Sequence, residues 1–197
     1  MKKLKSGTIW IIAVVAVVLI LLLTLWGSFN GLVSKEENVD EKWADVQSSY
    51  QRRADLIPNL VETVKGYRDY EQETLTQITQ LRSEAGQAKV QMKGATTPTE
   101  LEQANILLDN VRDGIKIIVE NYPDLDASEN FLSLQDELAG TENRIKVDRD
   151  NFNEAVRDYN IKVRRFPSNI VAGMFNFEVK DSFDADEGAE KVVKVEL

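Results

Sequence analysis

The amino-acid sequence predicts an all-α fold: an N-terminal transmembrane helix followed by an elongated antiparallel helical bundle of three long helices and a short fourth. Residues 9–26 form an apolar run without a charged side chain. In the rest of the chain, apolar residues recur at alternating steps of three and four, which is the helical period. No segment alternates at period two long enough to indicate a sheet, so the sequence favours helices packed on helices.

The first element is a membrane anchor. At about 1.5 Å per residue, the run 9–26 spans roughly 27 Å as a helix, close to the hydrocarbon thickness of a bilayer. Trp10 and Trp26 flank the run at positions typical of the two interfacial belts. Because no small-x-small cleavage site follows Trp26, we expect an uncleaved signal anchor that contacts the lipid bilayer through residues 9–26.

The charges on the two sides of the anchor predict its orientation. Lys2, Lys3 and Lys5 precede the apolar run, whereas acidic residues outnumber basic ones between residues 35 and 42. By the positive-inside rule, we expect the N-terminus in the cytoplasm and the C-terminal domain in a periplasm or an equivalent extracytoplasmic space. The chain then divides into a cytoplasmic basic N-terminus, an anchor, a juncture, a helical-bundle domain and an acidic tail: residues 1–8, 9–26, 27–34, 35–177 and 178–197.

The first bundle helix is expected to continue to about Gln91, before residues 93–97 break the pattern. It is much longer than the next helix, so it either kinks or projects from the membrane as a single-helix stalk. Its apolar stripe consists of Val39, Val46, Ile57, Leu60, Val64, Leu75, Ile78 and Leu81, with Trp43, Tyr50 and Tyr67 filling it in.

The second helix has a clear start, since Thr97 is a suitable N-cap, Pro98 takes the first helical position and Glu100 completes a capping box. Pro123 ends it, and residues 124–128 form a turn. The stripe of this helix is Leu101, Ala104, Leu108, Val111, Ile115, Ile118 and Tyr122.

The third helix is expected to stop at Pro167, and Ser168 is suited to cap a short fourth helix. From Glu178 onward the chain is an acidic tail. The third stripe is Phe131, Leu134, Leu138, Ile145, Phe152, Val156, Tyr159, Val163 and Phe166. The fourth helix carries Ile170, Val171, Met174, Phe175 and Phe177, and the tail has one late apolar cluster of Val192, Val193 and Val195.

The composition argues against catalysis and against a cofactor. The chain has no His and no Cys, which removes the commonest general base, the commonest transition-metal ligands and the thiol nucleophile. Asp124-x-Asp126-x-Ser128 resembles the opening of a calcium loop, but the sixth position is Glu129 and the twelfth is Gln135, so we predict no metal site. A net charge of −9 also disfavours nucleic acid as a partner.

One stretch, residues 51–62, is richer in polar residues than packing requires. Pro58 denies the Ala54 carbonyl its usual donor and is predicted to kink the helix. Arg53 falls on the apolar stripe, where a charge needs partners, and Asp55, Asn59 and Glu62 are the local candidates. The candidate network is Arg52, Arg53, Asp55, Pro58, Asn59 and Glu62. Two interpretations stay open: a buried network that fixes helix register, or a docking surface for another protomer or membrane protein.

Residues 51–67, which read Gln-Arg-Arg-Ala-Asp-Leu-Ile-Pro-Asn-Leu-Val-Glu-Thr-Val-Lys-Gly-Tyr, resemble the signature of the bacterial LemA family. Four other segments resemble the family as well: 120–125, 138–145, 159–169 and 183–189. The resemblance implies a bacterial single-pass membrane protein with a helical-bundle domain, and it implies no established activity or ligand. With the orientation predicted from the lysines, we expect the protein in the bacterial cytoplasmic (inner) membrane. It also singles out secondary positions: Tyr159, Asn160, Phe166, Pro167 and Asn169.

These observations lead to a functional expectation. A long helical surface, an anchor and the lack of catalytic groups favour a non-enzymatic membrane protein that self-associates as a homo-oligomer and scaffolds or organises membrane assemblies. The alternative is an adaptor or regulator of another membrane protein, such as a quality-control metalloprotease.

Overall fold

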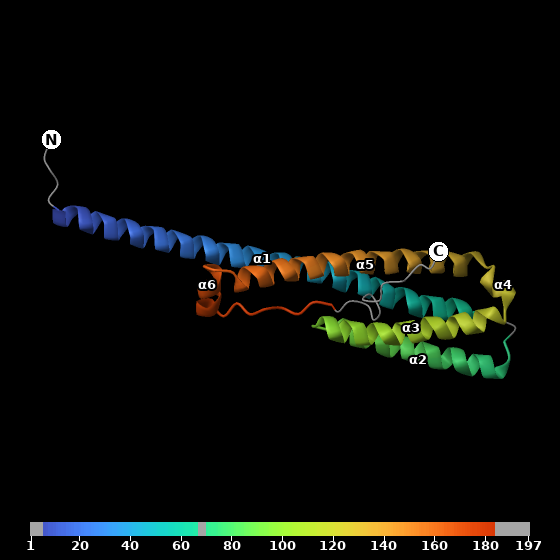
Figure 1. Ribbon diagram of the computed structural model, residues 1–197. Coiled ribbons are helices and arrows are strands. Elements are labelled where there is room, and N and C mark those ends of the chain that lie inside the picture. The colour runs from blue at the N-terminus through green and yellow to red at the C-terminus, as the bar shows by residue number, and fades with distance from the viewer. Residues whose placement is uncertain (1–5, 67–69, 184–197) are drawn as a thin grey trace, which may run out of the picture. The chain divides into compact units, whose positions relative to one another are not determined.

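The computed structural model describes residues 6–66 and 70–183 (Figure 1). These residues form helices and contain no strand, which confirms the predicted all-α class. The helices are α1 (Ser6–Lys65), α2 (Gln72–Gly94), α3 (Pro98–Glu120), α4 (Pro123–Asp126), α5 (Glu129–Arg164) and α6 (Ser168–Phe175). The three N-terminal lysines, Tyr67 and the valines of the late tail cluster lie outside the described residues.

Helix α1 carries both the apolar run and the first part of the bundle. It is the one helix in the described chain that is long and apolar enough to cross a membrane, as judged by length and composition. Residues 27–34, the expected juncture, are helical and belong to it. Within the run, the Thr24 hydroxyl donates to the Leu21 carbonyl at 2.8 Å, so its polar group is satisfied inside the helix. Trp10 and Trp26 are exposed.

The predicted single helix from residue 35 to Gln91 is wrong, because the structure divides this stretch into α1 and α2. Helix α1 passes through Pro58 and ends at Lys65, where the Gly66 amide donates to the carbonyls of Glu62 and Thr63. A glycine just beyond the last helical residue is a common helix terminator. Within residues 6–66 and 70–183, the structure therefore has four long helices, α1, α2, α3 and α5, where a transmembrane helix and three long bundle helices were predicted.

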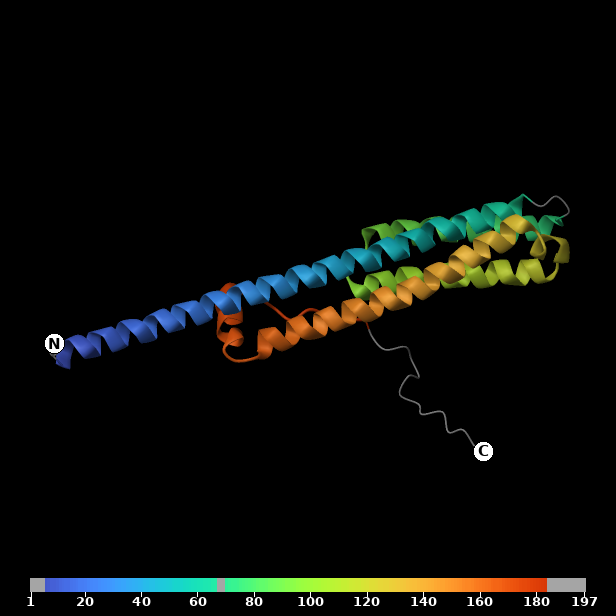
Figure 2. The ribbon, with the colours of Figure 1, turned by 90° about the horizontal axis from the view of Figure 1, so that it is seen from above.

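The described residues fall into two compact units, one of which comprises residues 42–66, 70–153 and 181–183. In this unit, α2 and α3 lie side by side (Figures 1 and 2). The capping box at the start of α3 is confirmed: the Glu100 amide donates to the Thr97 hydroxyl, and the Glu100 carboxylate accepts from the Thr97 amide. The core of the unit is built from the apolar stripes and includes Val46, Ile57, Leu60, Leu101, Leu108, Val111, Phe131 and Phe152.

The other unit contains residues 6–41 of α1 and residues 154–180, which include the end of α5 and α6. One cluster of its core contains Leu32, Val171 and Ala172, with Phe29, Val163 and Phe177 packed against it. Lys35 of α1 forms an ion pair with Asp158 of α5 at 2.8 Å.

The ends of α6 differ from the expectation. Ser168 is not a cap but the first residue of the helix, where its side chain is buried, and Pro167 occupies the cap position without a capping hydrogen bond. The helix ends at Phe175, and Asn176 follows with a positive φ of 58°. Asparagine is one of the few residues that adopt this left-handed conformation readily. Phe177 therefore lies beyond the helix in which it was expected.

The beginning of the acidic tail, residues 178–183, is held by two asparagines of α5. In one unit, the Asn160 amide group donates to the Lys180 carbonyl and accepts from the Lys180 amide, both at 2.9 Å. In the other unit, Asn153 makes the same pair of bonds to Phe183, at 3.2 and 2.9 Å. A carboxamide satisfies both backbone groups of a residue in this way, as a neighbouring strand would.

Candidate functional site

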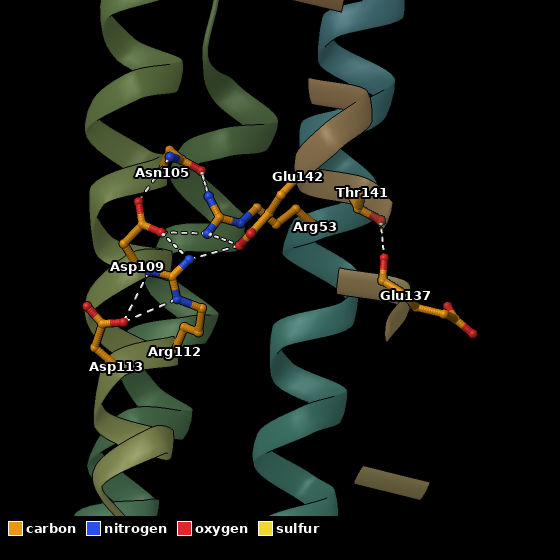
Figure 3. A network of polar contacts seen from close by, with 8 residues as sticks. All are labelled: Arg53, Asn105, Asp109, Arg112, Asp113, Glu137, Thr141 and Glu142. Atoms are coloured by element: carbon orange, nitrogen blue, oxygen red, sulfur yellow. Dashed lines mark hydrogen bonds and ion pairs between the residues drawn. The ribbon is translucent and has the colours of Figure 1, made fainter. Parts of the chain in front are cut away.

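The centre of the candidate site is Arg53, a buried arginine on α1 that is 4% exposed. Its guanidinium donates to Asn105 and Asp109 of α3 and to Glu142 of α5 (Figure 3). The contact to Asp109 measures 2.5 Å and the contact to Glu142 measures 3.1 Å. The planar fork of an arginine suits several acceptors at once. One side chain of α1 is thereby bonded to two other helices of its unit.

A second arginine, Arg112 of α3, contacts the same two carboxylates, those of Asp109 and Glu142. Its guanidinium lies 2.9 Å from Glu142, 3.1 Å from Asp113 and 3.4 Å from Asp109. Partial burial lowers the pKa of Arg112, but the Glu142 hydrogen bond and the charge of Asp109 outweigh it and raise that pKa above its ordinary value. Asp109 and Glu142 are each shared by two arginines, so the cluster is nearly balanced in charge.

The predicted local partners of Arg53 are wrong. Asp55 pairs with Lys89 of α2 at 2.8 Å, and Glu62 pairs with Arg82 of α2 at 2.7 Å. Asn59 is exposed, and its carbonyl accepts from the Thr63 hydroxyl. At about 100° per residue, these three positions lie roughly 180–240° around the helix from Arg53, on the opposite face. The distant helices α3 and α5 supply its acceptors instead.

Arg52 and Pro58 are the remaining residues of the predicted network. Arg52 is exposed and lies 3.7 Å from Glu137 of α5. Pro58 is half-buried inside α1, which continues to Lys65. Thr141, next to Glu142, is buried and donates to the Glu137 carbonyl at 2.8 Å (Figure 3).

The functional residues that the sequence reasoning missed are Asn105, Asp109, Arg112 and Glu142. Three of them occupy positions i, i+4 and i+7 of α3, which places them on one face. Each follows a residue of the buried stripe (Ala104, Leu108 and Val111) and so lies about 100° from it around the helix. The feature of the sequence that indicates these residues is a row of polar side chains beside the buried apolar stripe of α3.

A second polar group in this unit joins α1 to α5. The Ser49 hydroxyl donates to the buried Asp148 carboxylate at 2.5 Å, and the exposed Arg144 lies 3.7 Å from it. Nearby, Arg149 pairs with Glu102 of α3 at 3.3 Å. Its guanidinium also stacks 4.8 Å from the centre of the Phe183 ring.

Two buried tyrosines, Tyr50 and Tyr159, lie one in each unit. Burial raises the pKa of Tyr50 above its ordinary value, while the positive charge of Arg149 opposes the shift. Burial, followed by the charge of Glu36, likewise raises the pKa of Tyr159. Both phenols therefore stay protonated at neutral pH.

The secondary positions fall into two groups. Tyr159 is buried, and Asn160 holds the backbone of Lys180. Phe166, Pro167 and Asn169 lie at the surface around the start of α6.

The arrangement around Arg53 is suited to holding helices in register. Its carboxylates already accept from arginine, and no group of three or more potential metal ligands occurs within residues 6–66 and 70–183. Removal of one partner from such a cluster is costly because it leaves a buried charge uncompensated. These contacts join Arg53 of α1 to α3 and α5.

Comparison with known proteins gives a consistent result. The model of the LemA family matches residues 42–197. Protein LemA of Metamycoplasma hominis is 29% identical over 82% of this chain and 71% of its own length. Magnetosome protein MamQ 2 of Paramagnetospirillum magneticum is 24% identical over 92% of this chain and 75% of its own. Magnetosome protein MamQ of Magnetospirillum gryphiswaldense is 23% identical over 81% and 66%. None of these names is that of an enzyme.

Proposed function

Because the chain belongs to the LemA family, whose model covers most of its length, we propose that it is a non-enzymatic, membrane-anchored helical protein that self-associates and organises membrane assemblies. The observation that carries this proposal is helix α1. One uninterrupted helix contains the apolar run and also supplies Arg53 to the bundle. A protein built in this way presents a packed helical body from a membrane.

The polar chemistry of the body supports a structural role. In the described part of the body, the buried charged side chains of Arg53 and Asp148 are occupied by contacts between helices. An enzyme would need catalytic groups that face a substrate with poised protonation states. Relatives named as magnetosome proteins also support membership in an assembly.

Self-association is proposed to involve the outer face of α3. Ile106 and Ile117 are both exposed, the latter to 63%, and they lie eleven residues apart. At about 100° per residue that spacing returns to the same face within about 20°. Apolar side chains aligned on the solvent side of a helix favour pairing with a second helix, here α3 of a second copy.

Disulfide crosslinking in native membranes tests this proposal, because the chain contains no cysteine. An Ile117→Cys variant should give a crosslinked homodimer on mild oxidation. The matched control is Val147→Cys, an exposed position on α5, which should give little homodimer. Equal and weak crosslinking at both positions would overturn self-association through α3.

A second function, the adaptor, is favoured by one feature of the bundle. A cavity of about 380 Å³ between α1, α3 and α5 is lined by apolar residues that include Leu60, Ile115 and Phe131. Arg112 and Lys116 line it as well. A pocket of this kind suits an apolar side chain of a partner membrane protein. Gentle crosslinking should then recover a stoichiometric heterocomplex, and recovery of homodimers alone would contradict the adaptor.

We further propose the bacterial cytoplasmic membrane as the location, with the N-terminus in the cytoplasm and the bundle outside. The proposal rests on the lysines that precede the apolar run. Single cysteines are placed at Val147 and, in a separate variant, near the N-terminus, and a membrane-impermeant thiol reagent is applied to intact cells. The cysteine at Val147 should be labelled, and the cysteine near the N-terminus should be protected. Labelling of the N-terminal cysteine with protection of the other would reverse the topology.

A further inference from the structure

Helix α6 is apolar on both of its sides. Ser168, Val171 and Ala172 are buried, and two of them pack against Leu32 of α1. The opposite side carries Ile170 and Met174, both exposed, and Met174 is 66% exposed. Helices at a water-facing surface usually place polar residues on the outer side, so an apolar outer side indicates that something covers it.

The exposed apolar surface of α6 is continuous with the end of the membrane-spanning run. A cavity of about 410 Å³ is lined by Leu25, Trp26 and Phe29 of α1 and by Met174 and Phe175 of α6. The rings of Phe29 and Phe175 lie 4.8 Å apart between centroids. Phe175 is itself 57% exposed. The apolar surface therefore extends from the last turn of the run onto α6.

The direction of α6 fits a membrane surface. It lies across the direction of α1 in both views of the ribbon (Figures 1 and 2). If α1 crosses the bilayer, a helix that lies across it at the level of Phe29 runs along the interface, just beyond Trp26. Interfacial helices take this position, with apolar side chains in the boundary between headgroups and acyl chains.

The charge of this region complements anionic lipid. Residues 161–177 contain Lys162, Arg164 and Arg165 and no acidic residue, and residues 27–34 contain no charge at all. This is notable in a chain with a net charge of −9. Basic side chains close to a bilayer surface are attracted to anionic headgroups.

We propose that α6, together with Phe166, is a second membrane contact. The helix lies in the interface of the bilayer from which α1 emerges, with Ile170, Met174 and Phe175 in the apolar boundary. Lys162, Arg164 and Arg165 meet anionic headgroups. This inference rests on the proposed membrane anchoring by α1, and it assigns a partner, the lipid surface, to a separate segment of the chain.

A second copy of the chain fits this surface less well than lipid does. An isologous contact would place the basic cluster of one copy opposite the basic cluster of the other. Like charges that face each other disfavour such a contact. Lipid supplies both the apolar layer and the opposite charge at the same depth.

The test places an environment-sensitive fluorophore on single cysteines of the full-length chain in vesicles of phosphatidylcholine with phosphatidylglycerol. The positions are Met174 on α6, Leu21 in the apolar run as the bilayer reference and Val147 on α5 as the water reference. For Met174→Cys we expect strong quenching by lipids with a nitroxide at a shallow acyl position, and iodide quenching several-fold weaker than for Val147→Cys.

The outcomes separate this inference from the anchoring on which it rests. If Leu21→Cys is quenched by deep nitroxides while Met174→Cys is as open to iodide as Val147→Cys, the anchor stands and the α6 contact is refuted. If Leu21→Cys is open to iodide, the anchoring itself fails, and the α6 contact fails with it. Protection of Met174→Cys from iodide without lipid quenching, increasing with protein density, would assign the surface to a second copy and overturn the proposal.

The basic cluster gives a second readout. In the Met174→Cys background, Arg164→Gln with Arg165→Gln should weaken lipid quenching in vesicles that contain phosphatidylglycerol and should leave it nearly unchanged in pure phosphatidylcholine. High salt should have the same effect on the parent. Equal quenching in both kinds of vesicle, with and without the arginines, would refute the electrostatic part of the proposal. The helix signal in circular dichroism confirms that the variants are folded.

Discussion

Replacement of Arg53 by methionine separates the charge of this residue from its packing, because methionine keeps an aliphatic stem of similar length. The side chain of Arg53 is 5% exposed, whereas those of Asp109 and Glu142 are 34% and 37% exposed. Removing one partner of a buried ion pair costs about 3–5 kcal/mol. Here the two carboxylates keep some water and both keep Arg112, so we expect a loss of about 2–4 kcal/mol in the free energy of unfolding.

The assay is thermal unfolding of the full-length protein in mild detergent, followed by the helix signal in circular dichroism. For a chain of this size, 1 kcal/mol corresponds to roughly 2–4 °C, so Arg53→Met should lower the Tm by roughly 5–15 °C. The matched control is Arg52→Met, which removes one exposed ion pair at 3.7 Å. That change should cost under about 1 kcal/mol.

A double-mutant cycle tests whether the network acts as a unit. Once Arg53 is methionine, Glu142→Gln should cost less than it does in the parent, by about 1 kcal/mol or more, because the charge it removes has already lost a partner. The structural reasoning is refuted if Arg53→Met is no less stable than Arg52→Met. If that variant keeps its stability but no longer assembles, Arg53 belongs to a docking surface instead of a register-setting network.

Three further predictions concern local features. The Thr96 backbone and hydroxyl donate to Glu100 and hold the pKa of this carboxyl below its ordinary 4.5. Because the folded-state pKa is depressed, the stabilisation is present above pH 4.5 and is lost as the pH falls through the folded-state pKa. The Tm difference between the parent and Glu100→Gln should therefore be largest near neutral pH and vanish in acid, and a difference that grows in acid would contradict the assignment. Asn153→Leu removes both hydrogen bonds to Phe183 and should cost about 1–3 kcal/mol in thermal unfolding, whereas an unchanged Tm would show that the bonds contribute nothing. Ser49→Ala leaves the buried Asp148 without its hydroxyl donor and should also cost about 1–3 kcal/mol, and Ser49→Thr, which keeps a hydroxyl, should restore most of it.

The elements that the sequence predicted correctly are those encoded by neighbouring residues. The capping box of Thr97 and Glu100 involves four consecutive residues, so the sequence alone is enough to recognise it. The apolar stripe predicted which side of α3 is buried, as for Leu101 and Leu108, whereas Phe166, Met174 and Phe175 of the later stripes are exposed. The fold class and much of the buried core can therefore be predicted from such local periodicity.

The break between α1 and α2 could not be seen from periodicity. Both helices have the same period, and the apolar stripe resumes after the break with little change of phase. Gly66 is the residue in the sequence that marks the break. A glycine inside a helical pattern is often tolerated, so about fifty residues of regular spacing predict one continuous helix.

The partners of Arg53 lay beyond sequence reasoning for a different reason. The apolar stripe predicted that this arginine is buried and needs acceptors, and both statements hold. Which acceptors it finds depends on how α3 and α5 pack against α1, and Glu142 is 89 residues away in the chain. Periodicity within a helix contains no information about the rotation of one helix against another.

The central claim, that this membrane-anchored bundle acts by self-association, is tested most directly by the mass of the full-length protein in mild detergent. Light scattering behind a sizing column, corrected for bound detergent, measures that mass. We predict a discrete assembly whose mass is that of two or more chains. The double variant Ile106→Gln with Ile117→Gln should dissociate this assembly without a change in helix content. A strict monomer at every concentration, for the parent as well as the variant, would contradict the claim.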